Sequence, residues 1–174
     1  MADTYSAYAA GVTFDVGKSF LGIFNGVGSG KVIRVYRMWM LNNQTGAIAG
    51  DFTSFEIWTL SAMSGGSDAT VTKHDSSNAS LHTSVLVKYG ASAFTETSRI
   101  RKFMWCNDEA TQGTLVADDW ETFVPLCLIG RWGYGSTAKS PLVLREGQGL
   151  HLKHSGTMAI GNADVGLEFT QAAS

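Results

Sequence analysis

Charged residues are scarce in this chain. Asp, Glu, Lys and Arg make up 16% of its 174 residues, against about 25% in typical soluble domains, and the formal net charge is only -2. So weak a charge gives no electrostatic reason to expect a nucleic acid or an anionic membrane as partner. A surface poor in charge and rich in Ser, Thr and Gly instead favours a protein that is partly covered by neighbouring molecules or that works outside the cell.

Cysteines and long apolar runs are also scarce. The two cysteines, Cys106 and Cys127, lie in separate apolar segments, and without an export signal we expect small buried residues here and not a disulfide. No apolar run approaches the roughly 18 residues that a membrane-spanning helix needs, and residues 1–8 lack the basic and apolar regions of a signal peptide. The sequence therefore predicts a protein that is made in the cytosol and is not inserted into a membrane.

Short apolar segments with a period of two residues are present instead, most clearly in the last third of the chain. Two such segments flank the Gly-rich turn at residues 146–149, and a third follows shortly afterwards. Because alternate side chains of a strand point to opposite faces, each segment predicts a strand with one apolar face. The residues expected to face the core are Leu142, Leu144, Leu150, Leu152, Val165, Leu167 and Phe169.

Segments of this kind recur along the chain and define its fold class. Further strand candidates lie at residues 12–16, 20–24, 32–41, 55–60, 84–89, 99–106 and 122–129. No window offers a helix of ten or more residues, because Gly, Asn, Ser and Thr interrupt the apolar pattern. About nine or ten short strands without helices predict an all-β, single-domain antiparallel β-sandwich over residues 12–174, with a jelly roll favoured over a seven-stranded immunoglobulin-like domain. The polar residues 61–80 predict one long loop.

The first residues have a different character. Residues 1–11 are small and polar, with Tyr5 and Tyr8 interleaved, and we expect an extended N-terminal arm and not a strand of the core. Tyrosine is amphipathic and has only two side-chain torsions to fix on binding, so such an arm can order against a neighbouring molecule at modest entropic cost. Tyr5 and Tyr8 are therefore candidate interface residues.

A second set of candidate interface residues lies in a Gly-flanked segment that is predicted to be a loop. Arg131, Trp132 and Tyr134 combine a guanidinium group with two large rings. This combination is typical of interface hot spots and equally of platforms on which sugars stack. Self-assembly, a protein partner and a glycan all remain open. The other four tryptophans, Trp39 among them, lie in or beside predicted strands, where core packing is the expected role.

No motif for catalysis or cofactor binding stands out. The Gly-rich segment 26–31 suggests a phosphate loop, but Val32 stands where Ser or Thr is required, and a strand follows instead of a helix. His151 and His154 are three residues apart in a predicted strand, so they point to opposite faces and cannot share a metal ion. The acidic residues between 108 and 121 predict a solvated loop. We therefore expect a protein that is not an enzyme and that holds no metal ion and no cofactor.

The C-terminal strands carry a family resemblance. The segment Pro141-Leu-Val-Leu-Arg-Glu-Gly-Gln-Gly-Leu-His-Leu152, followed by residues 161–169, resembles small β-sandwich structural proteins of tailed bacteriophages, particularly capsid decoration (cement) proteins. In those proteins a hairpin of the form leucine, acidic-Gly-x-Gly, leucine precedes a strand that ends in Glu-Phe-Thr or a close variant. The resemblance covers roughly the last thirty residues, with weaker support from residues 31–37. It implies a virion protein without catalytic residues that folds as a jelly roll and sits on a capsid lattice made by another chain.

Three function classes follow. The first is a virion structural protein on the capsid surface, a decoration or cement protein whose partners are the major capsid protein and itself. For self-association a closed homo-oligomer, with a trimer favoured, would hide apolar surface and strand edges. The second class is a carbohydrate-binding jelly roll, such as a phage adhesin or a bacterial lectin. The third is a glycan-processing enzyme, whose sign would be two carboxyl groups facing each other across a groove. The resemblance favours the first class.

Overall fold

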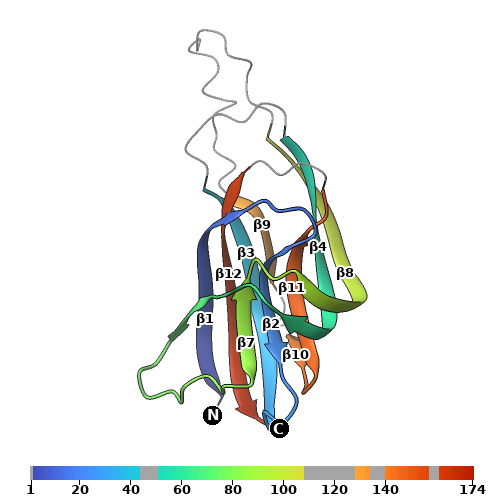
Figure 1. The fold of residues 1–174 in the computed structure, drawn as a ribbon. Helices are drawn as coiled ribbons and strands as arrows, with labels where there is room; N and C mark the ends of the chain where they lie inside the picture. Colours follow the sequence, from blue (N-terminus) through green and yellow to red (C-terminus); the bar gives the residue numbers. More distant parts are fainter. Residues whose placement is uncertain (1, 44–50, 108–127, 134–139, 157–160) are drawn as a thin grey trace.

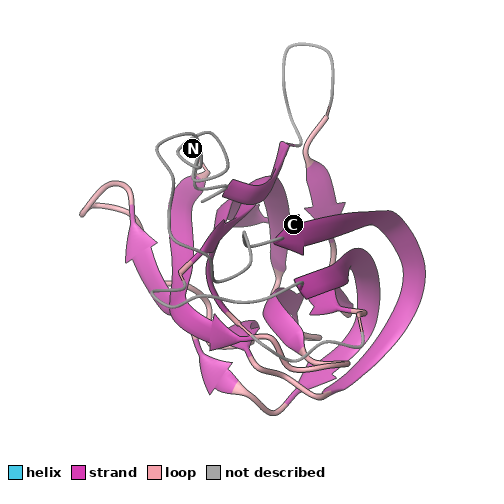
Figure 2. Ribbon diagram, turned by 90° about the horizontal axis from the view of Figure 1, so that it is seen from above, coloured by secondary structure: helices cyan, strands magenta, loops and turns pink. Residues whose placement is uncertain are grey.

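The structure is a computed structural model that describes residues 2–43, 51–107, 128–133, 140–156 and 161–174. In these ranges all regular secondary structure consists of β-strands (Figure 2). The strands are β1 (Asp3–Thr13), β2 (Ser19–Asn25), β3 (Lys31–Asn42), β4 (Asp51–Ser64), β5 (Ser67–Asp68), β6 (Thr70–Lys73), β7 (Val85–Tyr89), β8 (Ala93–Asn107), β9 (Leu128–Gly133), β10 (Leu142–Leu144), β11 (Gln148–His154) and β12 (Asn162–Ala173). Within the described ranges, no helix could cross a membrane.

The strands form two antiparallel sheets of six strands each, packed face to face (Figure 1). Sheet A has the order β6-β1-β12-β3, with β9 and β10 both on the far edge of β3, and sheet B has the order β5-β7-β2-β11-β4-β8. β9 lies opposite residues 37–41 of β3 and β10 opposite residues 33–35, so the two short strands continue one edge. The prediction of an all-β antiparallel sandwich is confirmed.

The connections between the sheets follow the order of a jelly roll. β1, β12, β3 and the β9–β10 edge form one sheet, while β2, β11, β4 and β8 form the other. This arrangement corresponds to two Greek keys folded over one another. β5, β6 and β7 are an insertion between β4 and β8 that widens both sheets. The prediction of a single loop over residues 61–80 is therefore wrong in part, because β5 and β6 are exposed strands that lack the apolar face by which a strand is recognised.

One large core lies between the sheets, and the C-terminal alternation was a correct guide to it. Six of the seven residues expected to face the core are at most 2% exposed, and the seventh, Leu142, packs against the buried cluster. β10 and β11 do not form a hairpin, however, since β10 pairs with β3 in sheet A whereas β11 pairs with β2 and β4 in sheet B. The turn between them carries the chain from one sheet to the other.

A carboxylate of the chain itself occupies the Gly-rich segment 26–31. Glu146 accepts hydrogen bonds from the backbone N–H groups of Gly28 (3.1 Å) and Gly30 (2.5 Å). Both glycines have positive φ, 80° and 59°, a conformation that side chains other than glycine rarely adopt. The segment is thus a crossing between β2 and β3 whose amide groups bind an internal anion.

The segment predicted to be an extended arm, residues 1–11, instead contains most of β1 (Asp3–Thr13). β1 is an inner strand of sheet A, paired with β12 on one side and with β6 on the other. Tyr5 is fully buried and stacks on Phe169, with ring centroids 5.4 Å apart. The prediction of an arm is wrong because Ala7 and Ala9 resemble surface residues in sequence, whereas their methyl groups fill the inward positions of a strand.

The ribbon of β4 and β8 curls over the outer face of sheet B. Irregularities in its pairing between Ile57 and Ala62 bend the ribbon, and its far end turns toward β2 and β7 (Figure 1). A second, smaller apolar cluster lies beneath it, formed by Leu60, Met63 and Ala91 with Phe24, Leu86 and Phe94 packed around them. No described strand covers the outer face of sheet A.

Candidate functional site

A row of four paired residues crosses the outer face of sheet A. Tyr8 of β1 lies opposite Gly166 of β12, Gly166 lies opposite Trp39 of β3, and Trp39 lies opposite Arg131 of β9. Directly paired residues of antiparallel strands project to the same face. Tyr8 is 39% exposed, Arg131 is exposed and Trp39 is half-buried, so this face is the outer one. We call these four residues the aromatic row.

Glycine at position 166 makes room for the indole of Trp39. A Cβ atom on Gly166 would lie 2.1 Å from Cε2 and Cζ2 of Trp39, far inside the roughly 3.5–4.0 Å of a carbon–carbon contact. The indole therefore lies across β12 and reaches Tyr8, with ring centroids 5.8 Å apart and ring planes tilted by 35°. Two rings from strands that do not pair with each other thus form one aromatic surface.

Asp164 lies two residues before Gly166 on the same face of β12, and its carboxylate fixes the position of Tyr8 at one side of this surface. Its carboxylate accepts hydrogen bonds from the Tyr8 hydroxyl (2.5 Å), from the Gly11 backbone N–H (2.8 Å) and from the Asn43 side-chain amide (2.6 Å). Burial alone would raise the pKa of Asp164, but these three donors hold it below its ordinary value. The hydrogen bond to Asp164 raises the pKa of Tyr8. The row is therefore held in place before anything binds.

The structure separates the residues that the sequence grouped as interface candidates. Tyr5 is fully buried and Trp132 is 5% exposed within the large core, so their prediction as surface residues is wrong. Tyr8 and Arg131 are exposed and belong to one row, although 123 positions of sequence separate them. Tyr134 lies outside the described residues, as do Cys127, the side chain of Cys106 and the acidic residues between 108 and 121.

Sequence reasoning missed Trp39, Gly166 and Asp164. A signal for Trp39 was present, since Arg37 two positions earlier marks the same face of β3 as the outer one, while Met38 and Met40 are fully buried. The same logic applies to β9, where exposed Arg131 places Trp132 on the inner face. Gly166 and Asp164 had no local signal, because their partnership with Trp39 and Tyr8 depends on strand register.

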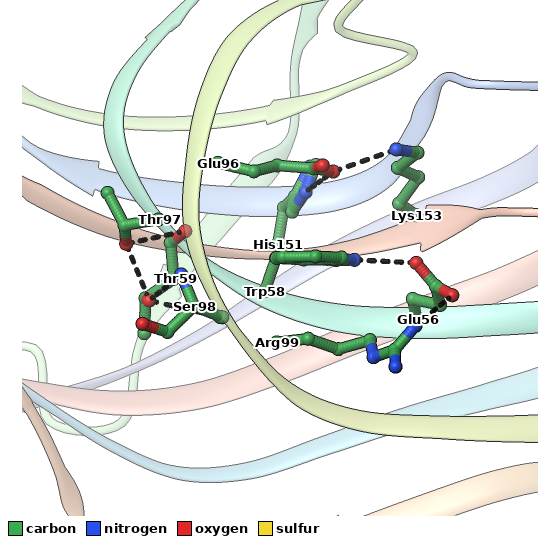
Figure 3. Close-up of polar contacts among 9 residues, drawn as sticks. All are labelled: Glu56, Trp58, Thr59, Glu96, Thr97, Ser98, Arg99, His151 and Lys153. Carbon is green, nitrogen blue, oxygen red and sulfur yellow. Dashed lines mark hydrogen bonds and ion pairs between the residues drawn. The ribbon is translucent and has the colours of Figure 1, made fainter.

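The outer face of sheet B carries a polar network beneath the curled ribbon (Figure 3). Glu96 of β8 contacts Nε2 of His151 (3.1 Å) and Nζ of Lys153 (2.9 Å), both on β11. The ring of Phe94 packs against that of His151, with centroids 4.4 Å apart. Where the β4–β8 pairing is irregular, the Thr59 and Thr97 hydroxyl groups bond to each other (2.7 Å). The ribbon is thus attached to the sheet by polar as well as apolar contacts.

A second carboxylate, Glu56, lies further along the same face and is 6% exposed. It accepts hydrogen bonds from Trp58 Nε1 (2.7 Å) and Arg99 Nη1 (3.1 Å), and Lys102 Nζ lies 3.5 Å away. Burial alone would raise the pKa of Glu56, but these donors and positive charges hold it below its ordinary value. Glu56 is therefore ionised and engaged by neighbours at neutral pH.

His151 is the one strongly shifted group of this network. It is fully buried, and burial lowers its pKa to about 4 against the opposing hydrogen bond and charge of Glu96. Since Glu96 is an acceptor, Nε2 carries the proton, and Nδ1 has no hydrogen-bond partner in the described part of the chain. A neutral imidazole sealed from solvent is placed to hold the ribbon and not to exchange protons with a substrate.

Metal binding finds no support in the described ranges, where no three His, Cys, Asp or Glu side chains lie together as ligands. His151 and His154 point to opposite faces of β11, as predicted: His151 contacts Phe94 on the outer side, and the ring of His154 lies among those of Phe14 and Phe20 in the core.

No family model, curated protein or solved structure matches the chain. The function is therefore argued from the geometry.

Proposed function

We propose that this chain is a non-enzymatic structural protein of a virus particle, a capsid decoration protein that associates with itself and attaches to a lattice of the major capsid protein. The resemblance of residues 141–152 and 161–169 supports it. The jelly-roll strand order also supports it, because viral capsid proteins use this architecture, as do lectins and cupins. The fold alone does not choose among these classes, and the observation that carries the proposal is the edge of sheet B.

β8 forms a long edge that is suited to assembly. It has 15 residues and, within the described residues, pairs only with β4. Monomeric proteins usually shorten or block such an edge, because its free N–H and C=O groups pair with other chains. Ile100 and Met104 on β8 are 38% and 57% exposed, whereas Arg99 and Lys102 are engaged by Glu56. Among the described residues, the edge thus combines backbone groups that pair with no further strand and exposed apolar side chains.

An assembly through this edge would bury the apolar side chains and satisfy the backbone groups together. When two different surfaces of neighbouring copies bind each other, the copies close into a ring if the rotation from one copy to the next is a whole fraction of a turn. For this chain we favour a ring of three copies. The interface would lie on the edge of sheet B, whereas the aromatic row lies on the outer face of sheet A.

Sedimentation velocity tests the self-association. The wild-type chain is expected to sediment as a closed oligomer, and Ile100→Glu and Met104→Glu are each expected to shift it toward the 18.6 kDa monomer. Val143→Glu is the matched control, because Val143 is 40% exposed at the edge of sheet A. A wild-type monomer at micromolar concentration, or an oligomer that neither β8 variant weakens, would contradict the proposed assembly.

Mass spectrometry tests the location. Purified particles of the virus whose genome carries this gene are expected to contain the chain at a copy number that follows that of the major capsid protein. Its absence from particles in which the major capsid protein is readily detected would refute the proposal.

A further inference from the structure

The aromatic row is a small apolar surface in polar surroundings. On one side of it, Glu168 and Arg37 form an ion pair (2.9 Å) across β12 and β3. On the other side lies the carboxylate of Asp164, and Thr70 of β6 pairs with Tyr8 at one end of the row. The apolar area of this face is therefore small: it consists of the rings of Tyr8 and Trp39, with the half-buried Leu41 beside them opposite Asp164.

This area is too small for a stable protein interface. Even a fully buried aromatic side chain contributes only about 150–250 Å², whereas a stable protein–protein contact needs roughly 800 Å² on each partner. Two rings side by side match a ligand of about the same size as themselves. A second copy of the chain would also have to cover the Arg37–Glu168 pair and Asp164.

The chemistry of the row fits a sugar ring. The face of an aromatic ring carries negative charge, and the C–H groups on one face of a pyranose carry partial positive charge, so the two surfaces attract each other. The rings of Tyr8 and Trp39 contact each other at a tilt of 35°, and together they form the aromatic platform against which a sugar ring can pack. Gly166 contributes by having no side chain to interrupt it.

Hydrogen-bonding groups lie at the rim of the platform, where the hydroxyl groups of a stacked sugar would project. Arg131 is exposed, and no ion pair joins it to another described residue, so its donors are available. A carboxylate has about four lone-pair sites, of which Asp164 uses three. One donor group and one acceptor group thus flank the two rings.

We propose that the aromatic row is a saccharide-binding site: a pyranose stacks on Trp39 and Tyr8, and Arg131 and Asp164 hydrogen-bond its hydroxyl groups. The site is separate from the β8 edge, so one chain can assemble through sheet B and present this face of sheet A to a glycan.

A glycan array of neutral hexopyranosides and of sialylated and uronic-acid oligosaccharides tests the site, followed by solution titration of the oligosaccharide that gives the strongest signal. Trp39→Ala is expected to weaken its binding by about tenfold or more, because an aromatic contact is lost. Tyr36→Ala is the matched control, since Tyr36 is another half-buried aromatic of β3 outside the row, and it should leave the affinity unchanged. Circular dichroism checks that each variant is folded.

Two further variants separate stacking from a loss of folding. Gly166→Ala keeps Trp39 but forces its indole from β12, because the added Cβ would lie 2.1 Å from the ring; it should weaken binding as Trp39→Ala does. Arg131→Gln, at the surface, should weaken it less.

Three outcomes would overturn the proposal: no binding across the array, undiminished binding by folded Trp39→Ala, or loss of the oligomer in Trp39→Ala, which would show that a second copy covers the row. Because Ile100→Glu leaves the row untouched, a monomeric Ile100→Glu variant that still binds the oligosaccharide separates this site from the proposed assembly.

Discussion

The two outer faces of the sandwich differ in what covers them. On sheet B the curled β4–β8 ribbon covers His151, which is bound to Glu96, and Glu56 of the ribbon itself is buried against its partners Trp58 and Arg99. On sheet A no described strand lies over Tyr8, Trp39 and Arg131, of which Tyr8 and Arg131 are exposed and Trp39 is half-buried. The comparison teaches that polar residues on an outer face do not by themselves mark a site. Polar residues that other parts of the chain cover stabilise the fold, whereas polar residues that stay exposed can contact a partner.

The largest expected effect comes from the core that both faces share. Leu167 is fully buried between the sheets, so Leu167→Ala should lower the free energy of unfolding by about 2–5 kcal/mol, the usual range for a truncated core leucine. Its neighbour Glu168 points outward and is half-buried, and Glu168→Ala should cost much less. Urea unfolding measures both, and equal losses would show that the inward–outward assignment of β12 is wrong.

A smaller effect is expected on the covered face of sheet B, where the free energy of unfolding should depend on pH through His151. The pKa of His151 is about 4 in the folded chain, below its ordinary value of 6.5, so the unfolded chain takes up the proton first as the pH falls. The stability linked to His151 is complete above about pH 6.5 and is lost between pH 6.5 and 4, by up to about 3 kcal/mol.

His151→Gln should flatten this part of the stability curve. Burial also lowers the pKa of His154, which gives a pH dependence of the same sign, so the difference between the wild-type and His151→Gln curves isolates His151. Chemical unfolding at a series of pH values provides the measurement. Parallel curves would mean that solvent reaches His151 and that the ribbon does not seal this face.

The smallest effect compares the two faces directly. Tyr8→Phe and Trp58→Phe each remove one hydrogen-bond donor from a carboxylate, Asp164 on sheet A or Glu56 on sheet B. Tyr8 is 39% exposed, so water can replace its hydroxyl and the cost should be at most about 1 kcal/mol. Glu56 is nearly buried, so Trp58→Phe should cost more, about 1.5–3 kcal/mol. Thermal or urea unfolding of the two variants measures both losses of stability. If Tyr8→Phe cost more than Trp58→Phe, the proposed distinction between the open face and the covered face would be wrong.

Much of the fold was predictable from sequence, because strand positions follow from local alternation. The strands that escaped prediction lack an apolar face or have one made of small residues, as in β6 and around Ala7 and Ala9 of β1. The turn before Gln148 was recognised, but whether a turn joins paired strands or crosses between sheets depends on distant partners.

The candidate site was less predictable. The segment that holds Arg131 and Trp132 is predicted from sequence to be a loop with both side chains at the surface, but it forms β9, in which these two neighbours point to opposite faces. Charge would have settled which of the two faces inward, since burying an unpaired guanidinium costs more than burying an indole. The contact between Trp39 and Gly166 arises from the register of β3 with β12, which no local pattern encodes.

The pairing of β1 with β12 determines how the sandwich resists a force that pulls on the ends of the chain. Asp3 lies opposite Gln171, and the two ends of the chain lie at the same pole of the molecule (Figure 1). A force that pulls these ends apart loads the hydrogen bonds of the two strands one after another, as in a zipper, because antiparallel ladder bonds run across the strands. A load along β8 would instead be shared in shear by the whole β4–β8 ladder. The molecule should therefore resist tension far better through its sheet edge than through its ends.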